Sequence, residues 1–391
     1  MNILLVIADL GLGGAQQVVI NLANELVNQK HKVWIFDAQP EYRVEGMISR
    51  LDNKVNLISK NYGEEHFSLT EKVFNFTLNK VSISKNLKNQ RFKKHVNNLN
   101  SAINSNVFDY VNSHTCWADF FVYKELKNLH GKWIISLHAS YNNLLDNKEN
   151  ISKYGPLVKK TINASSKIIY IHNEGITFLE NTLQIKIKKI KKIYNGIPAP
   201  PSKFKIRKQN LEIDKDDFVI LCASRASKLK GWYELAEAVV KLNKTNLKVI
   251  FAGSGPVLED IKLRYSNNKK FKFLGFANNI HDLLSISNIV CLPSYYNEAL
   301  PTILIESILQ NKPVIATNVG ETAKILENKK GKCGILINAN KGEELVKDLT
   351  NTINSFMLDN LSFDKEAFEE AKELFSIKKM VQNYLNYFSE S

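Results

Sequence analysis

The segment PSYYNEALPTILIES, residues 293–307, places two glutamates eight positions apart at the start of a helical pattern. Glu298 precedes the expected helix, and Glu306 lies inside it among mostly apolar neighbours. Burying a carboxylate without a partner is costly, so Glu306 is expected either to bind a ligand hydroxyl, such as a ribose diol, or to lie on the solvated edge of the helix. The pattern favours a ligand site at the mouth of this helix.

Short apolar runs lie on both sides of this segment, and they alternate with helical patterns along the whole chain. This alternation is typical of βα units and parallel sheets. The predicted strands cover residues 2–8, 32–37, 55–58, 108–112, 133–137 and 167–171 in the first half, and 218–224, 247–253, 270–275, 288–293 and 312–317 in the second. The predicted fold class is α/β, with two doubly wound, Rossmann-like halves in tandem.

The length of 391 residues exceeds the ~250 to 300 beyond which single cores usually split, so two domains are expected. The segment 195–217 is polar, contains prolines and has no periodicity, and we place the domain junction there. Ligands of such sheets bind beyond the C-terminal ends of the strands, so two facing halves would form a cleft.

The composition is that of a globular protein, with 44% apolar and 24% charged residues. No apolar run approaches the roughly 20 residues that cross a bilayer, and the start MNILLVIADLG lacks the basic region of a signal peptide, so a cytoplasmic location is expected. The four cysteines lie far apart and are interpreted as structural. The net charge of +14 indicates an anionic partner, unless it only reflects solvated lysines.

The glycine-rich turn ADLGLGGAQQVV, residues 8–19, follows the first predicted strand and opens a helix. Glycines let a backbone approach phosphate oxygens, and helix N-termini attract anions. Gly11 and Gly13 fit the dinucleotide fingerprint, but Gln16 occupies its third small position. Asp37 ends the second strand, where a dehydrogenase would hold ribose, although a strand-end turn residue is the preferred interpretation.

Three motifs in the second half decide between nucleotide enzymes. SRASKLKGW (224–232) brings Arg225 and Lys230 to a strand end beside a helix N-terminus, where their charge and the backbone dipole meet at one anion. FAGSGPVLEDI (251–261) carries a tight glycine turn before a helix, and PVIATNVGETAKI (313–325) repeats the strand, turn and helix.

The order of these motifs resembles glycosyltransferase family 4, the retaining enzymes of GT-B fold, over nearly the whole chain. The resemblance implies an acceptor-side Rossmann-like domain at 1–197 and a nucleotide-sugar-binding one at 198–370, facing across a cleft. Residues 371–391 would fold back as a helix onto the first domain. The glycine loop would then face the donor diphosphate, which argues against the dinucleotide interpretation.

The resemblance also assigns roles to matching positions. Arg225 and Lys230 would bind the diphosphate, Glu306 the ribose, and Glu298 the transferred sugar. His138, after the strand WIISL, matches the family's cleft histidine, which contacts the donor sugar, and His114 is a weaker candidate. The expected catalytic residues are His138, Arg225, Lys230 and Glu298. The expected nucleotide-sugar-binding residues are Gly13, Gly14, Arg225, Lys230, Gly253, Glu298, Ala299, Leu300, Thr302 and Glu306.

Breaking the bond between an anomeric carbon and a nucleotide diphosphate leaves negative charge on the phosphate. In other transferases Mg²⁺ stabilises that charge, whereas here Arg225 and Lys230 would do so, and neither a metal nor a cofactor is expected. A D-x-D occurs at Asp214 and Asp216, but it lies in a polar loop before a strand and is interpreted as turn chemistry. The resemblance implies retention by front-face attack within an ion pair.

A basic stretch between Glu71 and Asp109 contains no acidic residue, and Lys80 to Lys94 carry most of its charge. Apolar residues recur there near helical spacing, so it would bind an anionic membrane surface or pack on its own domain. The run KIKKIKK (186–192) adds further positive charge. No nucleic-acid-binding motif accompanies these bases, so nucleic acid is not an expected partner.

These observations predict a retaining, metal-independent hexosyltransferase. It would move a hexose or N-acetylhexosamine, most readily from a UDP-linked donor, to a bacterial surface glycan such as lipopolysaccharide or capsule, in the cytoplasm or peripherally on the inner face of the membrane. Two alternatives remain: a GT-B nucleotide-sugar epimerase, which needs no acceptor, and a non-catalytic GT-B partner subunit of a glycan synthase.

Overall fold

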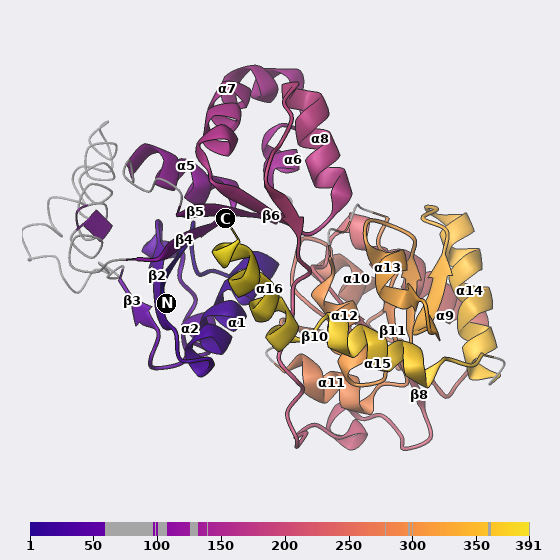
Figure 1. The fold of residues 1–391 in the computed structure, drawn as a ribbon. Helices are drawn as coiled ribbons and strands as arrows, with labels where there is room; N and C mark the ends of the chain where they lie inside the picture. Colours follow the sequence, from indigo (N-terminus) through magenta and orange to yellow (C-terminus); the bar gives the residue numbers. More distant parts are fainter. Residues whose placement is uncertain are drawn as a thin grey trace, which may run out of the picture. The chain divides into compact units, whose positions relative to one another are not determined.

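The structure is a computed structural model, and it describes residues 1–58, 97, 99–100, 108–125, 132–138, 140–277, 279–295, 298, 300–358 and 361–390. The chain divides into two compact units. Unit 1 comprises Met1–Gly196 and Met380–Ser391, and unit 2 comprises Ile197–Lys379. Figure 1 colours the chain by residue number, so the elements of each unit can be followed in sequence order.

The described residues of unit 1 form a seven-stranded sheet of order β3-β2-β1-β4-β5-β6-β7, and every pairing in it is parallel. Its strands are β1 (Asn2–Ile7), β2 (Lys32–Asp37), β3 (Asn56–Leu57), β4 (Tyr110–His114), β5 (Trp133–Leu137), β6 (Lys167–Tyr170) and β7 (Ile190–Lys192). Among the central strands, β1 is apolar from Ile3 onward because helices cover both faces of such a sheet, whereas β4 carries the buried polar residues Asn112, Ser113 and His114. β1 is buried from Ile3 to Ile7.

In the described ranges of unit 1, helices lie between most of these parallel strands, and one more helix follows from the C-terminal part of the chain. They are α1 (Gly14–Asn28), α2 (Glu45–Ile48), α5 (Cys116–Glu125), α6 (Ser140–Leu144), α7 (Lys148–Ala164), α8 (Asn173–Leu183) and most of α16 (Ile377–Ser389). α16 is held to the sheet by two kinds of contact: Lys167 donates to the carbonyl oxygen of Tyr387 (2.7 Å), and the hydroxyls of Tyr384 and Ser136 lie 3.2 Å apart.

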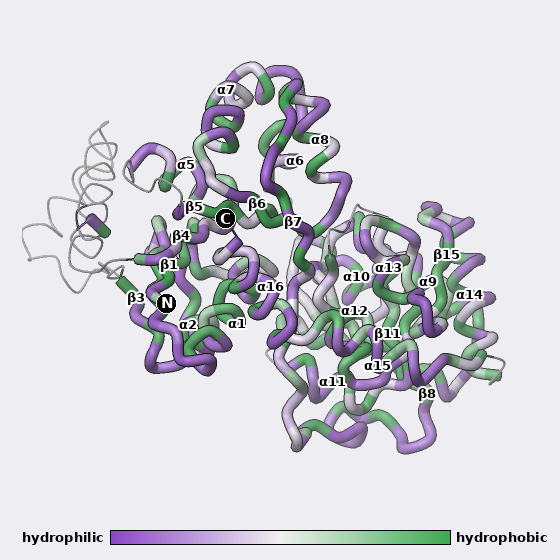
Figure 2. The backbone as a smooth tube through the Cα atoms, in the orientation of Figure 1, coloured by the Kyte–Doolittle hydropathy of each residue, from purple (hydrophilic) through white to green (hydrophobic). Residues whose placement is uncertain are grey.

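The described residues of unit 2 form a six-stranded sheet of order β10-β9-β8-β11-β12-β15, again with every pairing parallel. Its strands are β8 (Phe218–Ala223), β9 (Leu247–Ala252), β10 (Phe271–Gly275), β11 (Ile289–Leu292), β12 (Val314–Thr317) and β15 (Gly334–Ile337), with β13 (Glu327–Asn328) and β14 (Gly331–Lys332) as a separate antiparallel pair. Figure 2 shows hydrophobic colour along the central strands, where the core lies.

The helices of unit 2 are α9 (Trp232–Leu242), α10 (Leu258–Arg264), α11 (Ile280–Ile286), α12 (Thr302–Leu309), α13 (Thr322–Leu326), α14 (Glu343–Met357) and α15 (Lys365–Leu374). α9 packs against α14, and α12 packs against α15. The core is anchored by Trp232, which is fully buried with its ring centroid 4.9 Å from that of Phe251. Because Trp232 is the first residue of α9, this packing fixes the helix directly beside the loop that follows β8.

The predicted α/β class with two doubly wound sheets is confirmed, but the C-terminal division differs from the expected one. α15 belongs to unit 2 rather than to a segment that begins at 371, because it contacts α12, β13 and β14. Backbone bonds of Ile197 with Phe375 (3.0 Å) and Ile377 (3.2 Å) hold this part of the chain in unit 2. The C-terminal segment that groups with unit 1 begins at Met380.

Candidate active site

Two loops meet at the carboxyl edge of the sheet in unit 2. The first follows β8 and carries Arg225, which is exposed, and Lys230, which is half-buried. The second follows β11 and carries Glu298. The loops are tied together because the backbone N–H of Tyr295 (3.1 Å) and the hydroxyl of Ser294 (3.3 Å) both donate to the carbonyl oxygen of Leu229.

Lys230 and Glu298 form an ion pair across these two loops, with the ammonium nitrogen on carboxylate Oε1. Their side chains are only 18% and 13% exposed. A charge that is largely withdrawn from water needs a partner, and each of these two groups supplies one for the other. The structure therefore brings together two predicted site residues that lie 68 positions apart in the chain.

Two glycines allow the loops of this edge to lie backbone to backbone. At Gly253 (φ +153°) an added Cβ would lie 1.9 Å from the carbonyl oxygen of Ser224. At Gly231 (φ +66°) it would lie 2.1 Å from the carbonyl oxygen of Pro293. A glycine is therefore needed at position 253 so that the loop that carries Arg225 can pack closely against it. This structural role is separate from the donor contact that the sequence predicts for Gly253.

The predicted contacts beyond Glu298 lie at the start of α12. Thr302 is its first residue and is half-buried, and Leu300 is 9% exposed, so Leu300 offers a ligand little beyond its backbone. Glu306 lies on the second turn and is half-buried between the buried Ile305 and Ser307. Its position agrees with neither a fully buried nor a fully solvated carboxylate. Ala299 lies outside the described residues.

The glycine loop of unit 1 is shaped by Asp9, which the sequence analysis did not identify. Its Oδ1 accepts from the backbone N–H of Gly11 (2.8 Å) and from the side-chain amide of Gln16 (3.1 Å). The first of these bonds is an Asx turn, so an aspartate two residues before a glycine was the available sequence signal. Gly13 and Gly14 are exposed, and nothing lies within 4 Å of a Cβ placed on Gly14.

The carboxylate of Asp37 pairs with a side chain of the protein itself. It is fully buried and accepts two bonds from the guanidinium of Arg43, at 2.7 Å and 2.6 Å. A bidentate pair of this kind uses both carboxylate oxygens. Asp37 is therefore a structural residue at the end of β2, as the preferred interpretation of the sequence had it.

His138 follows β5 and lies beside His114, the last residue of β4. Nδ1 of His114 and Nε2 of His138 are 2.9 Å apart, and the two rings are inclined by 21°. Burial, and secondarily the neighbouring ring of His138, lowers the pKa of His114 well below its ordinary value. Burial also lowers the pKa of His138 to about 4. Both imidazoles are thus neutral near pH 7, so they share one hydrogen bond without charge repulsion.

A buried polar network lies next to this histidine pair. The hydroxyl of Ser113 donates to Oδ1 of Asp119 (2.5 Å), and the hydroxyl of Tyr141 donates to Oδ2 (2.9 Å). The indole N–H of Trp133 donates to the Ser113 hydroxyl (2.8 Å). Burial raises the pKa of Asp119 to about 7, although the two hydroxyl bonds oppose this rise. The network fixes β4, β5 and α5 where the histidines emerge.

Comparison with known proteins identifies this pair of sheets and loops. Residues 12–199 match the family described as Glycosyltransferase Family 4, and residues 203–373 match that described as Glycosyl transferases group 1. The chain belongs to glycosyltransferase family 4. The predicted resemblance is confirmed, and it covers both units.

Two named relatives of this family 4 chain act on diphosphoundecaprenol-linked sugars. One is the UDP-Gal:alpha-D-GlcNAc-diphosphoundecaprenol alpha-1,3-galactosyltransferase of Escherichia coli. It is 25% identical to this chain over 211 residues, and the match covers 51% of this chain and 54% of that protein. The chain thus spans about half the length of this relative. The other is an alpha-1,4-N-acetyl-D-galactosaminyltransferase of Campylobacter jejuni, whose named substrate is GalNAc-alpha-(1->4)-GalNAc-alpha-(1->3)-diNAcBac-PP-undecaprenol. It is 24% identical to this chain over 401 residues, and the match covers 100% of this chain and 99% of that protein.

Among solved structures, Anabaena HepE in complex with UDP and glucose superposes on this chain with a TM-score of 0.73. The sequence identity is 18%, and the superposition covers 99% of both chains. At that identity the likeness establishes the fold, which is GT-B.

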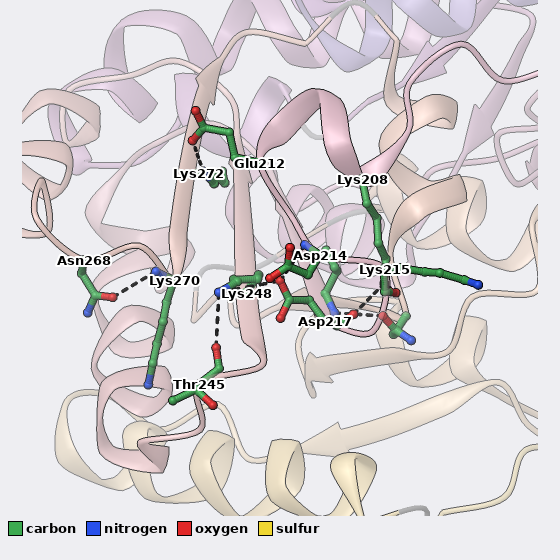
Figure 3. A network of polar contacts seen from close by, with 12 residues as sticks. Lys208, Glu212, Asp214, Lys215, Asp217, Thr245, Lys248, Asn268, Lys270 and Lys272 are labelled. Atoms are coloured by element: carbon green, nitrogen blue, oxygen red, sulfur yellow. Dashed lines mark hydrogen bonds and ion pairs between the residues drawn. The ribbon is translucent and has the colours of Figure 1, made fainter.

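The D-x-D of this glycosyltransferase lies at the opposite edge of the sheet from the candidate site. Asp217 immediately precedes β8, its Oδ2 accepts from the backbone N–H of Asp214 (2.9 Å), and it lies 3.7 Å from the ammonium of Lys248. Figure 3 shows these groups within a network of lysines and turn carbonyls. The aspartates close a turn, as predicted. Within the part of the chain that the structure describes, no cluster of three His, Cys, Asp or Glu side chains suits a metal ion.

The predicted membrane contact through Lys80 to Lys94 lies outside the described residues. The second basic run, 186–192, enters the sheet as edge strand β7. None of the helices in the described ranges has both the length and the apolar character needed to cross a membrane.

Proposed function

We propose that this glycosyltransferase moves a hexose or N-acetylhexosamine from a UDP-linked donor, with retention, onto a lipid-linked glycan of a bacterial surface polymer. The observation that carries the proposal is the convergence of Arg225, Lys230 and Glu298 on two hydrogen-bonded loops at the carboxyl edge of unit 2. Doubly wound sheets bind their ligands at this edge.

In the proposed complex, the diphosphate lies against Arg225 and Lys230. Arg225 is exposed and available to phosphate oxygens, and the ammonium of Lys230 is shared between Glu298 and the diphosphate. Glu306, on the second turn of α12, accepts hydrogen bonds from the ribose hydroxyls. Glu298 binds hydroxyls of the transferred sugar, a neutral group that leaves its ion pair with Lys230 intact.

The chemical step needs stabilisation of the negative charge that develops on the leaving diphosphate. The exposed Arg225 and the half-buried Lys230 supply it, and removal of a group that stabilises such charge typically costs 10²- to 10³-fold in rate. We propose that the reaction proceeds without a metal ion because Arg225 and Lys230 occupy the electrostatic role that Mg²⁺ has in other transferases. In the proposed reaction no carboxylate acts as a nucleophile, and the departing phosphate itself takes the proton of the acceptor hydroxyl.

His138 is proposed to donate a hydrogen bond to an oxygen of the donor sugar. The low pKa of its ring, about 4, keeps it neutral at physiological pH, so it recognises a hydroxyl or ether oxygen rather than competing for the diphosphate.

The proposed acceptor class is supported by the Escherichia coli and Campylobacter jejuni relatives, whose names give undecaprenol-linked saccharides as their acceptors.

The first test is thermal unfolding with UDP, GDP, ADP, CDP and NAD, each in EDTA and in Mg²⁺. A ligand at ~100 times its dissociation constant adds about 2.7 kcal/mol to native-state stability, so binding is visible as a higher Tm. We expect a shift with UDP that persists in EDTA. A shift that requires Mg²⁺ would overturn metal independence, and a shift with NAD alone would overturn the transferase proposal.

The second test compares Arg225→Ala with Lys228→Ala. Both side chains are exposed and basic and lie in the same loop, but only Arg225 is placed at the diphosphate. Turnover of UDP-sugar with an undecaprenyl-diphosphate-linked acceptor should fall at least 100-fold in the first variant and stay within about twofold in the second. Equal losses would show that the loop contributes only general positive charge.

A further inference from the structure

The buried end of the histidine pair has an unusual hydrogen-bonding state. His114 is fully buried, and its Nε2 has no hydrogen-bonding partner among the described residues. Its other nitrogen, Nδ1, is 2.9 Å from Nε2 of His138. The pair thus shares one hydrogen between the two facing nitrogens, and the ring of His114 ends in an unpaired buried atom.

Two arrangements of protons satisfy the shared bond, and they differ at that buried atom. If Nε2 of His138 donated, neutral His114 would carry its hydrogen on Nε2, and this would bury an N–H without an acceptor. If Nδ1 of His114 donates, its Nε2 is a bare lone pair. Orphaned buried N–H groups are the rarer and more costly defect, so the second arrangement is favoured.

The second arrangement fixes the state of His138 as well. Its Nε2 accepts from His114, so a neutral ring must carry its hydrogen on Nδ1. Both rings are held neutral by burial, since the pKa of His138 is lowered to about 4 and that of His114 is lowered well below its ordinary value. The tautomer of a functional histidine is usually set by the bond that its other nitrogen makes.

We propose that His114 is a positioning residue that holds His138 as the neutral Nδ1–H tautomer, and so makes His138 a hydrogen-bond donor to an uncharged oxygen of the ligand. The donor-sugar identity of that oxygen rests on the proposed function, whereas the tautomer is a property of unit 1 alone. The ligand group recognised is a hydroxyl or ring oxygen that accepts, and the proposal excludes a group that can only donate.

The direct test is ¹⁵N NMR of the histidine side chains in the full chain near pH 7.5. The internal reference is His172, whose Nδ1 accepts from the backbone N–H of Gly175 (3.1 Å) and which must therefore show the opposite, Nε2–H pattern when neutral. We expect His138 to show a protonated Nδ1 and an unprotonated Nε2. Finding the Nε2–H pattern at His138 would overturn the proposal, whether or not the protein transfers any sugar.

Two variants separate the hydrogen bond from simple packing. His114→Phe keeps an aromatic ring but removes the donor, whereas His114→Asn loses the ring but offers a side-chain N–H to Nε2 of His138. We expect the Nδ1–H population of His138 to fall in the first variant and to be retained, in larger part, in the second. A structural role would give the reverse order, with Phe tolerated and Asn not.

Kinetics provide the readout that depends on function. Loss of one hydrogen bond to the ligand corresponds to roughly a tenfold effect, so kcat/KM for the donor should fall about tenfold in His114→Phe and recover in His114→Asn. If the wild-type protein shows the Nδ1–H pattern at His138 but transfers no sugar from a UDP-linked donor, the proposed function is contradicted and the positioning role of His114 stands.

Discussion

The ammonium of Lys230 lies on the carboxylate of Glu298, so the two charged groups that the resemblance assigns to opposite ends of the donor, its diphosphate and its sugar, form one ion pair. Both side chains are largely withdrawn from solvent. Each charge therefore depends on the other for its orientation. Removal of one should disturb the remaining one as well as its own ligand contact.

Lys230→Met should weaken UDP binding and lower turnover about 10²- to 10³-fold, because it removes the proposed diphosphate contact and leaves Glu298 without its cationic partner. Glu298→Gln should lower kcat and also weaken UDP binding, though less than Lys230→Met does, because the proposed sugar contact is weakened and Lys230 loses its charged partner. Calorimetric titration with UDP and steady-state kinetics measure the two effects. In the double variant, the losses should be non-additive by about 0.5–3 kcal/mol, as for contacting residues. Strict additivity would contradict the coupling.

Gly14→Ala tests the glycine loop as a phosphate site without disturbing the fold. No atom lies within 4 Å of the added methyl group, and the position opens α1, so the variant should unfold at the same or a higher temperature. We expect donor affinity to fall about tenfold, since the methyl group occupies the space that a backbone offers to phosphate oxygens.

The matched control for Gly14→Ala is Gly11→Ala. Its Cβ would lie 2.8 Å from Oδ1 of Asp9 and 3.1 Å from the carbonyl oxygen of Tyr42. This variant should lower Tm, because the Asx turn must shift. Full activity of Gly14→Ala would exclude a phosphate role for the loop and leave it a purely structural turn.

The local features of the fold could be predicted from sequence because they depend on neighbours along the chain. The strand at 133–137 was predicted correctly, since apolar runs define parallel strands, and His138 directly follows its carboxyl end. β7 and β15 were missed because they are short edge strands, and β7 lies within a lysine-rich run whose side chains give no apolar signal.

The pairings within the site could not be predicted in the same way. The Lys230–Glu298 ion pair and the His114–His138 bond join residues 68 and 24 positions apart, and neither has a local sequence signature. Such contacts depend on the order of strands in the sheet, which places β4 beside β5 and β8 beside β11. The residue types at the site follow from the sequence, whereas their partners follow from the topology.

Asp37 should behave as a structural residue. Asp37→Ala removes the carboxylate that accepts two bonds from the Arg43 guanidinium, and breaking a buried ion pair by removal of one partner typically costs about 3–5 kcal/mol. Denaturant unfolding should reveal this loss, while saturating UDP should still raise Tm by as much as in the wild type. The double variant Asp37→Ala/Arg43→Ala should lose less than the sum of the single variants. An unchanged stability with lost UDP binding would return Asp37 to a ligand role.

Asp119 should make the stability of the protein depend on pH in a specific direction. Its pKa is raised from 3.8 to about 7 by burial, so the native state holds this proton more tightly than the unfolded state. Between these values the native state binds more protons, and stability therefore falls as pH rises. The contribution is fully present below about pH 4 and lost as pH passes through about 7, with a total of at most about 4 kcal/mol.

Asp119→Asn replaces the titrating group by a neutral one that still accepts a bond from Tyr141. The variant's Tm relative to the wild type should therefore rise from about pH 4 to about pH 7 and level off above it. Glu149→Gln, at an exposed carboxylate in the first turn of α7, is the control and should show no such trend. Parallel Tm curves for Asp119→Asn and the wild type would mean that the buried carboxylate titrates at its ordinary pKa, with the hydroxyls of Ser113 and Tyr141 offsetting its desolvation completely.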